Sequence, residues 1–117
     1  MSEREAAYQL YITKRSGQAY VVRGVKFDGV DETGLLEAKG PGYAAFVRDG
    51  QFQEFFQKTD DLLDQARRQL EAAKGMPIIW HIAEPEAMEA MQKLLASKGF
   101  GDITFVNTPV KTPPEEP

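Results

Sequence analysis

The run from Pro77 to Ala83, PIIWHIA, constrains the fold most strongly because it is apolar on both alternations. A strand with one wet face alternates apolar and polar residues, so this run predicts a central strand buried on both faces. Such a strand belongs to a sheet that is covered by helices. The sequence therefore predicts an α/β fold with one central mixed sheet flanked by helices.

The segments around this run predict elements in the order α-β-β-β-α-β-α-β. A right-handed crossover would place the strand at 35–39 parallel to the strand at 77–83, after a three-stranded antiparallel meander. The first strand region is bent or broken at Gly24. Cap and stop residues are Ser2, Ser16-Gly17, Thr59, Gly75 and Pro85. The expected helices are 3–14, 59–74 and 85–98, and the expected strands are 19–23, 25–30, 35–39, 77–83 and 102–106.

Length and composition set the bounds on function. A chain of 117 residues forms one domain, predicted over 1–108, and the Pro/Glu-rich tail 109–117 is expected to be disordered. The chain has no cysteine, which excludes disulfides and thiolate metal sites, and His81 is its single histidine. A net charge of −4 gives no overall attraction to nucleic acid, so phosphate binding would need a local basic patch. No signal peptide or membrane-length apolar run is present.

The hairpin KFDGVDETGLLEAKG carries charges among apolar residues. Glu37 and Lys39 are two residues apart on one strand, so their side chains leave the same face. A two- or four-residue loop centred on Glu32-Thr33 would place Asp28 opposite Glu37, on that face. A three-residue loop with a bulge would send Asp28 to the other face. The cluster is then either an ordinary solvated hairpin face or a site.

The chemistry that such a site supports is metal-assisted hydrolysis of phosphodiester bonds. We expect the carboxylates of Asp28 and Glu37 to share one hard cation, usually Mg²⁺, for which Mn²⁺ can substitute. The cation would lower the pKa of a bound water and neutralise the charge that builds on phosphate. The Lys39 ammonium would orient the attacking water or stabilise the developing anion.

A family resemblance follows from these segments. Asp28 followed by Glu37-Ala38-Lys39, in the order helix, meander, helix, buried strand, resembles the PD-(D/E)xK nuclease core, the restriction-endonuclease-like αβββαβ fold. Phe27 stands where the motif's name has proline, a position that varies in the superfamily. More narrowly, FDGVD, LLEAKGPGY and PIIWHIAEPEA resemble the restriction-endonuclease-fold toxin domains, class 5, of bacterial polymorphic toxins. LLEAKGPGY is the most specific piece, and the resemblance spans roughly residues 5 to 108.

The resemblance implies a biological setting. Such domains end larger secreted proteins, often type VI secretion effectors, which are delivered into the cytoplasm of competing bacteria. There they degrade DNA, while a cognate immunity protein protects the producer. The chain would then be an excised module of a larger effector. Two alternatives stay open: an RNase of the same fold, and a non-catalytic binding module with a degenerate nuclease fold.

Other polar residues have two interpretations each. Gln65 and Gln69 are one helical turn apart, and related nucleases use a glutamine here to orient the lysine or the water; otherwise both lie on a solvated flank. Glu5 is either an extra site acid or a charge that complements the helix dipole. His81 is either catalytic or a hydrogen-bonded core histidine, and Trp80 is most simply core. The candidate phosphate contacts are Lys14, Arg15, Arg23, Lys26, Arg48, Lys58, Arg67 and Arg68.

Overall fold

The computed structural model describes residues 3–14, 19–54 and 56–110 of the 117. Three α-helices, a short 3-10 helix and eight strands follow one another in these ranges. They are α1 (Glu3–Thr13), β1 (Tyr20–Val22), β2 (Val25–Phe27), β3 (Gly29–Asp31), β4 (Gly34–Lys39), η1 (Ala44–Phe46), β5 (Val47–Arg48), β6 (Gln51–Phe52), α2 (Thr59–Ala73), β7 (Ile78–Ile82), α3 (Pro85–Ala96) and β8 (Thr104–Asn107).

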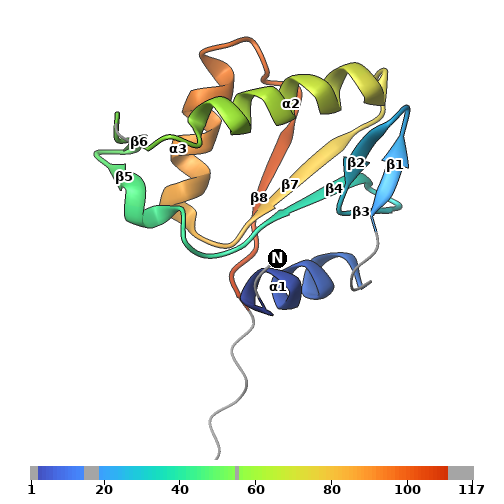
Figure 1. Ribbon diagram of the computed structural model, residues 1–117, viewed down its shortest axis with the longest axis horizontal. Coiled ribbons are helices and arrows are strands. Elements are labelled where there is room, and N and C mark those ends of the chain that lie inside the picture. The colour runs from blue at the N-terminus through green and yellow to red at the C-terminus, as the bar shows by residue number, and fades with distance from the viewer. Residues whose placement is uncertain (1–2, 15–18, 55, 111–117) are drawn as a thin grey trace, which may run out of the picture.

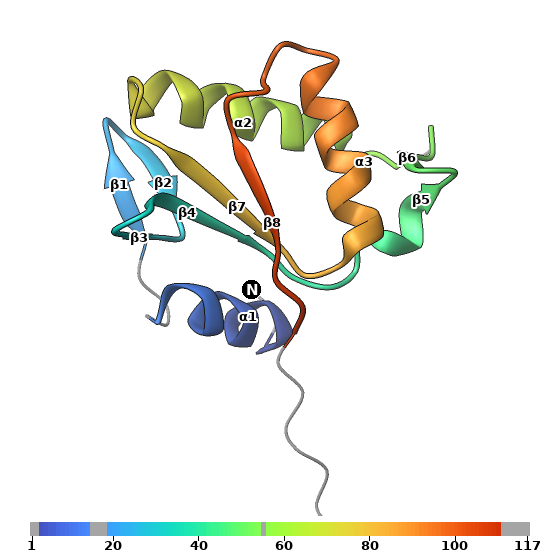
Figure 2. The same cartoon turned by 180° about the vertical axis from the view of Figure 1, so that it is seen from behind.

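The central sheet has four strands in the order β3-β4-β7-β8. β3 runs antiparallel to β4, whereas β4, β7 and β8 are parallel, so the sheet is mixed as predicted. The two views show α1 on one side of this sheet and α2 with α3 on the other (Figures 1 and 2). The α/β fold with a flanked mixed sheet is therefore confirmed. None of the helices in the described ranges is long and apolar enough to span a membrane.

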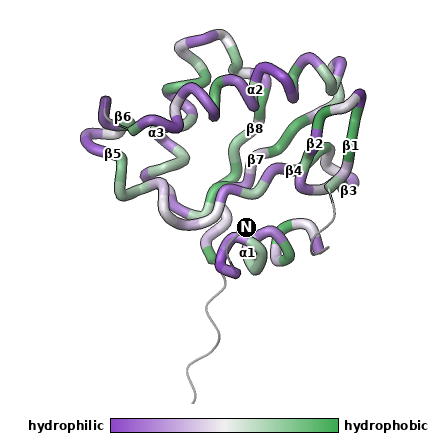
Figure 3. The backbone as a smooth tube through the Cα atoms, in the orientation of Figure 1, coloured by the Kyte–Doolittle hydropathy of each residue, from purple (hydrophilic) through white to green (hydrophobic). Residues whose placement is uncertain are grey.

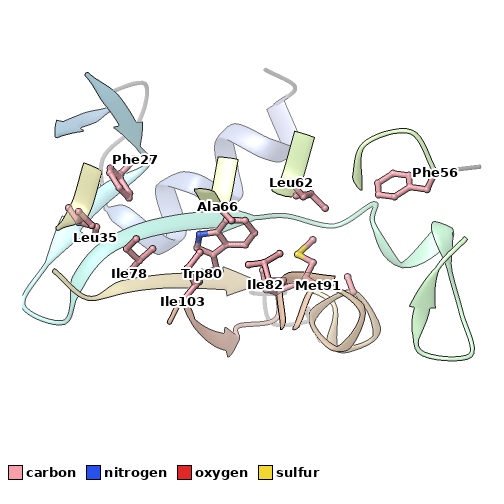
Figure 4. Close-up of a cluster of buried hydrophobic side chains, with 13 residues drawn as sticks. Phe27, Leu35, Phe56, Leu62, Ala66, Ile78, Trp80, Ile82, Met91 and Ile103 are labelled. Atoms are coloured by element: carbon pink, nitrogen blue, oxygen red, sulfur yellow. The ribbon is translucent and has the colours of Figure 1, made fainter. Parts of the chain in front are cut away.

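The main core lies between the sheet and the α2–α3 layer. β7 contributes Ile78, Trp80 and Ile82 from alternate positions, each at most 1% exposed. Figure 4 shows Trp80 beneath Ala66 of α2 and Ile82 beside Met91 of α3. The intervening Ile79 is 7% exposed and lies outside this cluster. Because alternate residues leave opposite faces of a strand, β7 is buried on both sides, as its sequence predicts.

Hydrophilic residues recur along α2 (Figure 3), and Leu62, Ala66 and Ala73 are its residues in this core. Two predicted helix signals have different outcomes. Thr59 is the first residue of α2, and Lys58 occupies the N-cap position without a side-chain hydrogen bond, so the predicted threonine cap is wrong. The stop signal is confirmed, because Lys74 and Gly75 both have positive φ directly after the last helical residue. Ser2, Ser16-Gly17 and the tail beyond residue 110 lie outside the described residues.

The predicted meander is two hairpins. β1 and β2 form a separate pair that turns at Arg23-Gly24, where both residues have positive φ, and the chain is interrupted again at Asp28. β3 and β4 pair through Gly29 with Leu36 and Asp31 with Gly34, so their loop has two residues. Of the two registers that the sequence left open, this is the one that places Asp28 opposite Glu37. Only glycine suits position 34, because φ is 146° and a Cβ would lie 2.4 Å from the Pro77 carbonyl oxygen.

Candidate active site

Asp28 lies where the chain leaves β2 and enters β3. Continuing the β3–β4 register places it opposite Glu37. Its backbone N–H donates to the Leu36 carbonyl at 2.9 Å, and its Oδ2 accepts from the Ala38 N–H at 2.8 Å. The carboxylate thus bonds to β4 where β3 no longer pairs with it. This interruption fixes the Asp28 side chain against the part of β4 that β3 leaves unpaired.

A pocket of about 270 Å³ opens at this edge. Asp28, Glu37 and Lys39 all line it, together with Glu5 and Gln9 from α1. The remaining wall comes from Ala38 of β4, from Gly40, Pro41 and Tyr43 of the loop that follows it, and from Lys58 before α2. A separate pocket of about 360 Å³, between β6 and α3, contains none of the three. The structure therefore brings the predicted acid–acid–lysine set into one pocket.

Glu37 is held by an amide network from α2. Gln65 Nε2 donates to Glu37 Oε2 at 2.8 Å, and Gln69 Nε2 donates to Glu37 Oε1 at 3.1 Å. Gln69 in turn accepts from the Trp80 indole N–H at 2.9 Å. Glu37 is 5% exposed and Gln69 is fully buried, so these bonds compensate for the loss of hydration. The network fixes both oxygens of the carboxylate.

Lys39 is a buried cation beside this carboxylate. Its Nζ lies 3.1 Å from Glu37 Oε2, donates to Gln65 Oε1 at 2.5 Å, and sits 5.1 Å from the centre of the Trp80 ring. Burial lowers the pKa of Lys39, but the neighbouring Glu37 charge and others raise it more, so the net shift is upward. The side chain is therefore an ammonium at neutral pH, with no tendency to act as a base.

Among the three residues, Asp28 has a charge that its surroundings disfavour. Its pKa is raised from 3.8 to about 6, first because burial disfavours the charged form and second because the Glu37 charge repels it. The Ala38 N–H and the Lys39 ammonium lower the pKa, but by less. Two carboxylates therefore face one buried cation, Lys39, while Lys58 lines the pocket from an exposed position. A further cation bound by the two carboxylates would relieve this imbalance.

The donor set fits a hard divalent cation such as Mg²⁺, because it consists of carboxylate oxygens. Within the described residues, no three acidic or histidine side chains come together as a ready cation cage. Mg²⁺ commonly binds through one or two carboxylates and keeps several waters or phosphate oxygens. Asp28 and Glu37 suit this open mode, in which the substrate completes the coordination.

Of the three supporting candidates, Glu5 and Gln65 lie at the site and His81 does not. Glu5 lies at the wall of the pocket, and Gln65 bridges Lys39 and Glu37. His81 is not brought to the cluster: it pairs with Ala38 across the parallel register, and its Nδ1 lies 2.8 Å from Thr108 Oγ1. Its side chain therefore leaves the face opposite Glu37. Burial lowers the pKa of His81, which fits a hydrogen-bonded structural role.

The sequence left two interpretations open for Gln69 and did not point to Gln9. The solvated-flank interpretation of Gln69 is wrong, because this residue is buried and bonds to Glu37. Its spacing from Leu62, Ala66 and Ala73 continues the apolar stripe of α2, which is the signal that could have found it. Gln9 is 7% exposed and lines the pocket from α1.

Among the basic residues considered as phosphate contacts, two lie next to the site. Lys58 and Arg68 line an adjoining pocket of about 240 Å³ that also includes Lys39 and Gln65, so both can face a bound phosphate chain. Arg68 also pairs with Asp64 at 3.0 Å. Arg67 pairs with Asp64 and Glu71 on the exposed side of α2, and Arg23 donates to the Ala72 carbonyl at the end of that helix. Arg15 lies outside the described residues.

A family model described as restriction endonuclease fold toxin 5 matches residues 5–85 of the chain. This range includes Asp28, Glu37 and Lys39 as well as the amide network on α2. It ends at the first residue of α3. No curated protein matches the chain significantly.

Proposed function

The chain belongs to the restriction endonuclease fold toxin 5 family, and we propose that it is a Mg²⁺-dependent nuclease toxin domain that hydrolyses DNA. One observation carries the proposal: Asp28, Glu37 and Lys39 converge on a single pocket at the end of β4. The raised pKa of Asp28 supports it, because carboxyl groups with strongly shifted pKa values cluster at functional sites.

In this proposal each residue has a distinct task. Asp28 and Glu37 would hold Mg²⁺, which would supply a water of lowered pKa and neutralise charge on the phosphate. Lys39, which stays protonated, donates to a phosphate oxygen as negative charge builds there. Gln65 sets the spacing between Lys39 and Glu37 and so keeps the cation and the carboxylate in fixed orientation.

The proposed setting is competition between bacteria. As part of a larger secreted effector, of the type VI secretion kind, the domain would be delivered into the cytoplasm of a target cell and cleave its DNA. A cognate immunity protein would protect the producing cell by covering the path of the DNA. The description of the family as toxins supports this setting.

The direct test is cleavage of supercoiled plasmid by the purified chain with Mg²⁺ or Mn²⁺. We expect nicking that EDTA stops and that Lys39→Ala reduces by at least a hundredfold, the loss expected for a charge-stabilising donor. A structured RNA of similar length runs in parallel. Cleavage of RNA alone would support the RNase alternative, and cleavage of neither would support a non-catalytic module.

A second test is growth of bacteria that express the chain without an inhibitor. We expect arrest with the wild-type chain and relief with Lys39→Ala. The matched control is Lys98→Ala, an exposed lysine after α3, which should leave the arrest unchanged. Harmless expression of folded wild-type chain would contradict the toxin proposal.

A further inference from the structure

Trp80 is a buried residue of β7 that is connected to the acidic pocket. Its side chain is fully buried beneath α2 (Figure 4), and the parallel register pairs it with Glu37 of β4. A buried indole N–H needs an acceptor, and any carbonyl oxygen would satisfy it. Here the acceptor is the side chain of Gln69, which itself bonds to Glu37. Trp80 is therefore linked to a predicted metal ligand through one intervening amide.

The chemistry of its two ends gives this hydrogen-bond relay one direction. An indole N–H can only donate, whereas an ionised carboxylate can only accept. Trp80 Nε1 donates to Gln69 Oε1 at 2.9 Å, which leaves the Gln69 amide nitrogen to donate to Glu37 Oε1 at 3.1 Å. The orientation of the Gln69 amide is thus fixed from both ends. Hydrogen bonds in such a chain also polarise one another.

A second relay of the same kind reaches the other oxygen of Glu37. The Lys39 ammonium, which also can only donate, bonds to Gln65 Oε1 at 2.5 Å, and Gln65 Nε2 donates to Glu37 Oε2 at 2.8 Å. Trp80 contributes here as well, because the centre of its ring lies 5.1 Å from Lys39 Nζ, within the range of a cation–π interaction. One tryptophan therefore contacts a member of each relay.

The hydrogen bonds of the first relay are complete. Among the residues that the structure describes, every buried side-chain nitrogen and oxygen has a partner. Glu37, Gln69 and Trp80 are each at most 5% exposed. Removing the indole N–H would take the donor from Gln69 Oε1 at a place that solvent reaches poorly. Because an unsatisfied buried carbonyl is unfavourable, Gln69 would shift toward another donor and loosen its bond to Glu37.

We propose that Trp80 is a positioning residue for the cation site: through Gln69 it fixes one oxygen of Glu37, and its ring face holds the Lys39 side chain. This inference rests on the proposed function, because it requires Glu37 to bind a metal ion. A carboxylate has about four acceptor positions, so the bonds from Gln65, Gln69 and Lys39 leave room for that ion. Trp80 thus has a role in the site besides its role in the core.

The test measures metal affinity in variants that interrupt the relay. Trp80→Phe keeps an aromatic face beside Lys39 but removes the N–H, so the calorimetric Mn²⁺ affinity should fall roughly tenfold. Gln69→Met keeps a side chain of similar size without either hydrogen bond and should lower the affinity at least as much. In the Gln69→Met background, Trp80→Phe should change the affinity by less than about twofold, because the relay is already broken.

Phe105→Leu is the matched control for lost packing. The ring of Phe105, on β8, lies against the Trp80 ring with centroids 5.7 Å apart and planes 66° apart, and it belongs to neither relay. This variant should lower the melting temperature and leave the Mn²⁺ affinity unchanged. Thermal denaturation of each variant establishes that it is folded at the temperature of the titration.

A spectroscopic test needs no substitution of Trp80. Trp80 is the single tryptophan of the chain, so its indole N–H gives one resonance in a ¹H–¹⁵N spectrum. A cation at Glu37 would change the polarisation of the relay. Mg²⁺ should therefore shift this resonance in the wild type, with the same midpoint as the calorimetric titration, and should leave it in place in Gln69→Met.

Full Mn²⁺ affinity of folded Trp80→Phe would overturn the inference, as would independent, multiplying losses in the double variant. An equal loss in Phe105→Leu would assign the effect to packing and overturn it too. So would an indole resonance that stays fixed while Mg²⁺ binds the wild type. All these results leave plasmid cleavage by the wild type intact. Failure of the wild type itself to bind Mn²⁺ would instead contradict the proposed metal site.

Discussion

Replacing Asp28 by asparagine should make the metal-free protein more stable. Asparagine is nearly isosteric with aspartic acid, and its Oδ1 can accept the Ala38 N–H that Asp28 accepts. It removes the charge that burial and Glu37 oppose. A residue kept for stability alone would give the reverse result, because its replacement would lose favourable interactions.

The magnitude follows from the shift in pKa from 3.8 to about 6. One pKa unit is worth about 1.4 kcal/mol, so keeping Asp28 ionised costs the folded state at most about 3 kcal/mol. Because the side chain is partly exposed, solvent screening reduces the expected gain for Asp28→Asn to about 1–2 kcal/mol.

The stability gained by Asp28→Asn should depend on pH. Between the unfolded and folded pKa values, the folded chain binds more protons, so this group's contribution is complete below pH 3.8 and is lost as pH rises through about 6. The advantage of Asp28→Asn should therefore be largest at pH 7.5 and disappear near pH 4. Urea denaturation in EDTA at both pH values measures it.

Asp31→Asn is the matched control on the same hairpin. Hydrogen bonds from Thr33 lower the pKa of Asp31, so the charged form is favoured in the folded chain. Its replacement should slightly destabilise the protein at pH 7.5, opposite in sign to Asp28→Asn. Equal destabilisation by both variants, or an effect of Asp28→Asn that does not vary with pH, would refute the reasoning.

The other predictions concern the network around Glu37. Gln69→Ala should destabilise the fold by about 2–4 kcal/mol in urea denaturation, because it removes the partner of the buried Trp80 N–H and of Glu37 Oε1 and opens a cavity. Gln92→Ala, on the exposed side of α3, should change stability by less than about 0.5 kcal/mol. Lys39→Ala should leave calorimetric Mn²⁺ affinity unchanged or slightly higher while cleavage falls, and loss of metal binding would contradict its assigned role. Gln65→Ala should reduce the cleavage rate less than Lys39→Ala does, because it acts through its neighbours; an equal or larger loss would assign it a direct role.

The fold was predictable where one pattern determined it. The apolar run of β7 placed a buried central strand, and Pro85 and Gly75 marked helix boundaries. The break at Asp28 was not predictable, because the bond between its carboxylate and the Ala38 N–H depends on two strands already lying side by side. The prediction of Thr59 as the N-cap of α2 was wrong for a different reason: several polar residues near position 59 are equally plausible starts for the helix.

The candidate site was predictable to the extent that side-chain alternation and a tight turn define it. Glu37 and Lys39 share a face by spacing alone, and the two-residue loop brings Asp28 opposite. The role of Gln69 could not be predicted in the same way, because a polar residue on the apolar stripe of a helix can be assigned a role only when its buried hydrogen-bond partner is known. For Gln69 that partner is Glu37, and it comes from another element.

The most direct test of the central claim is plasmid nicking by Asp28→Asn at saturating Mg²⁺ and pH 7.5. If the Asp28 charge exists to hold the cation, this variant should be at least as stable as the wild type yet cleave at least a hundredfold more slowly, equivalent to about 3 kcal/mol of lost transition-state stabilisation. Unfolding could then not explain the loss of cleavage by Asp28→Asn. Cleavage at the wild-type rate by the folded variant would contradict the assignment of Asp28 as a metal ligand and the hydrolytic mechanism built on it.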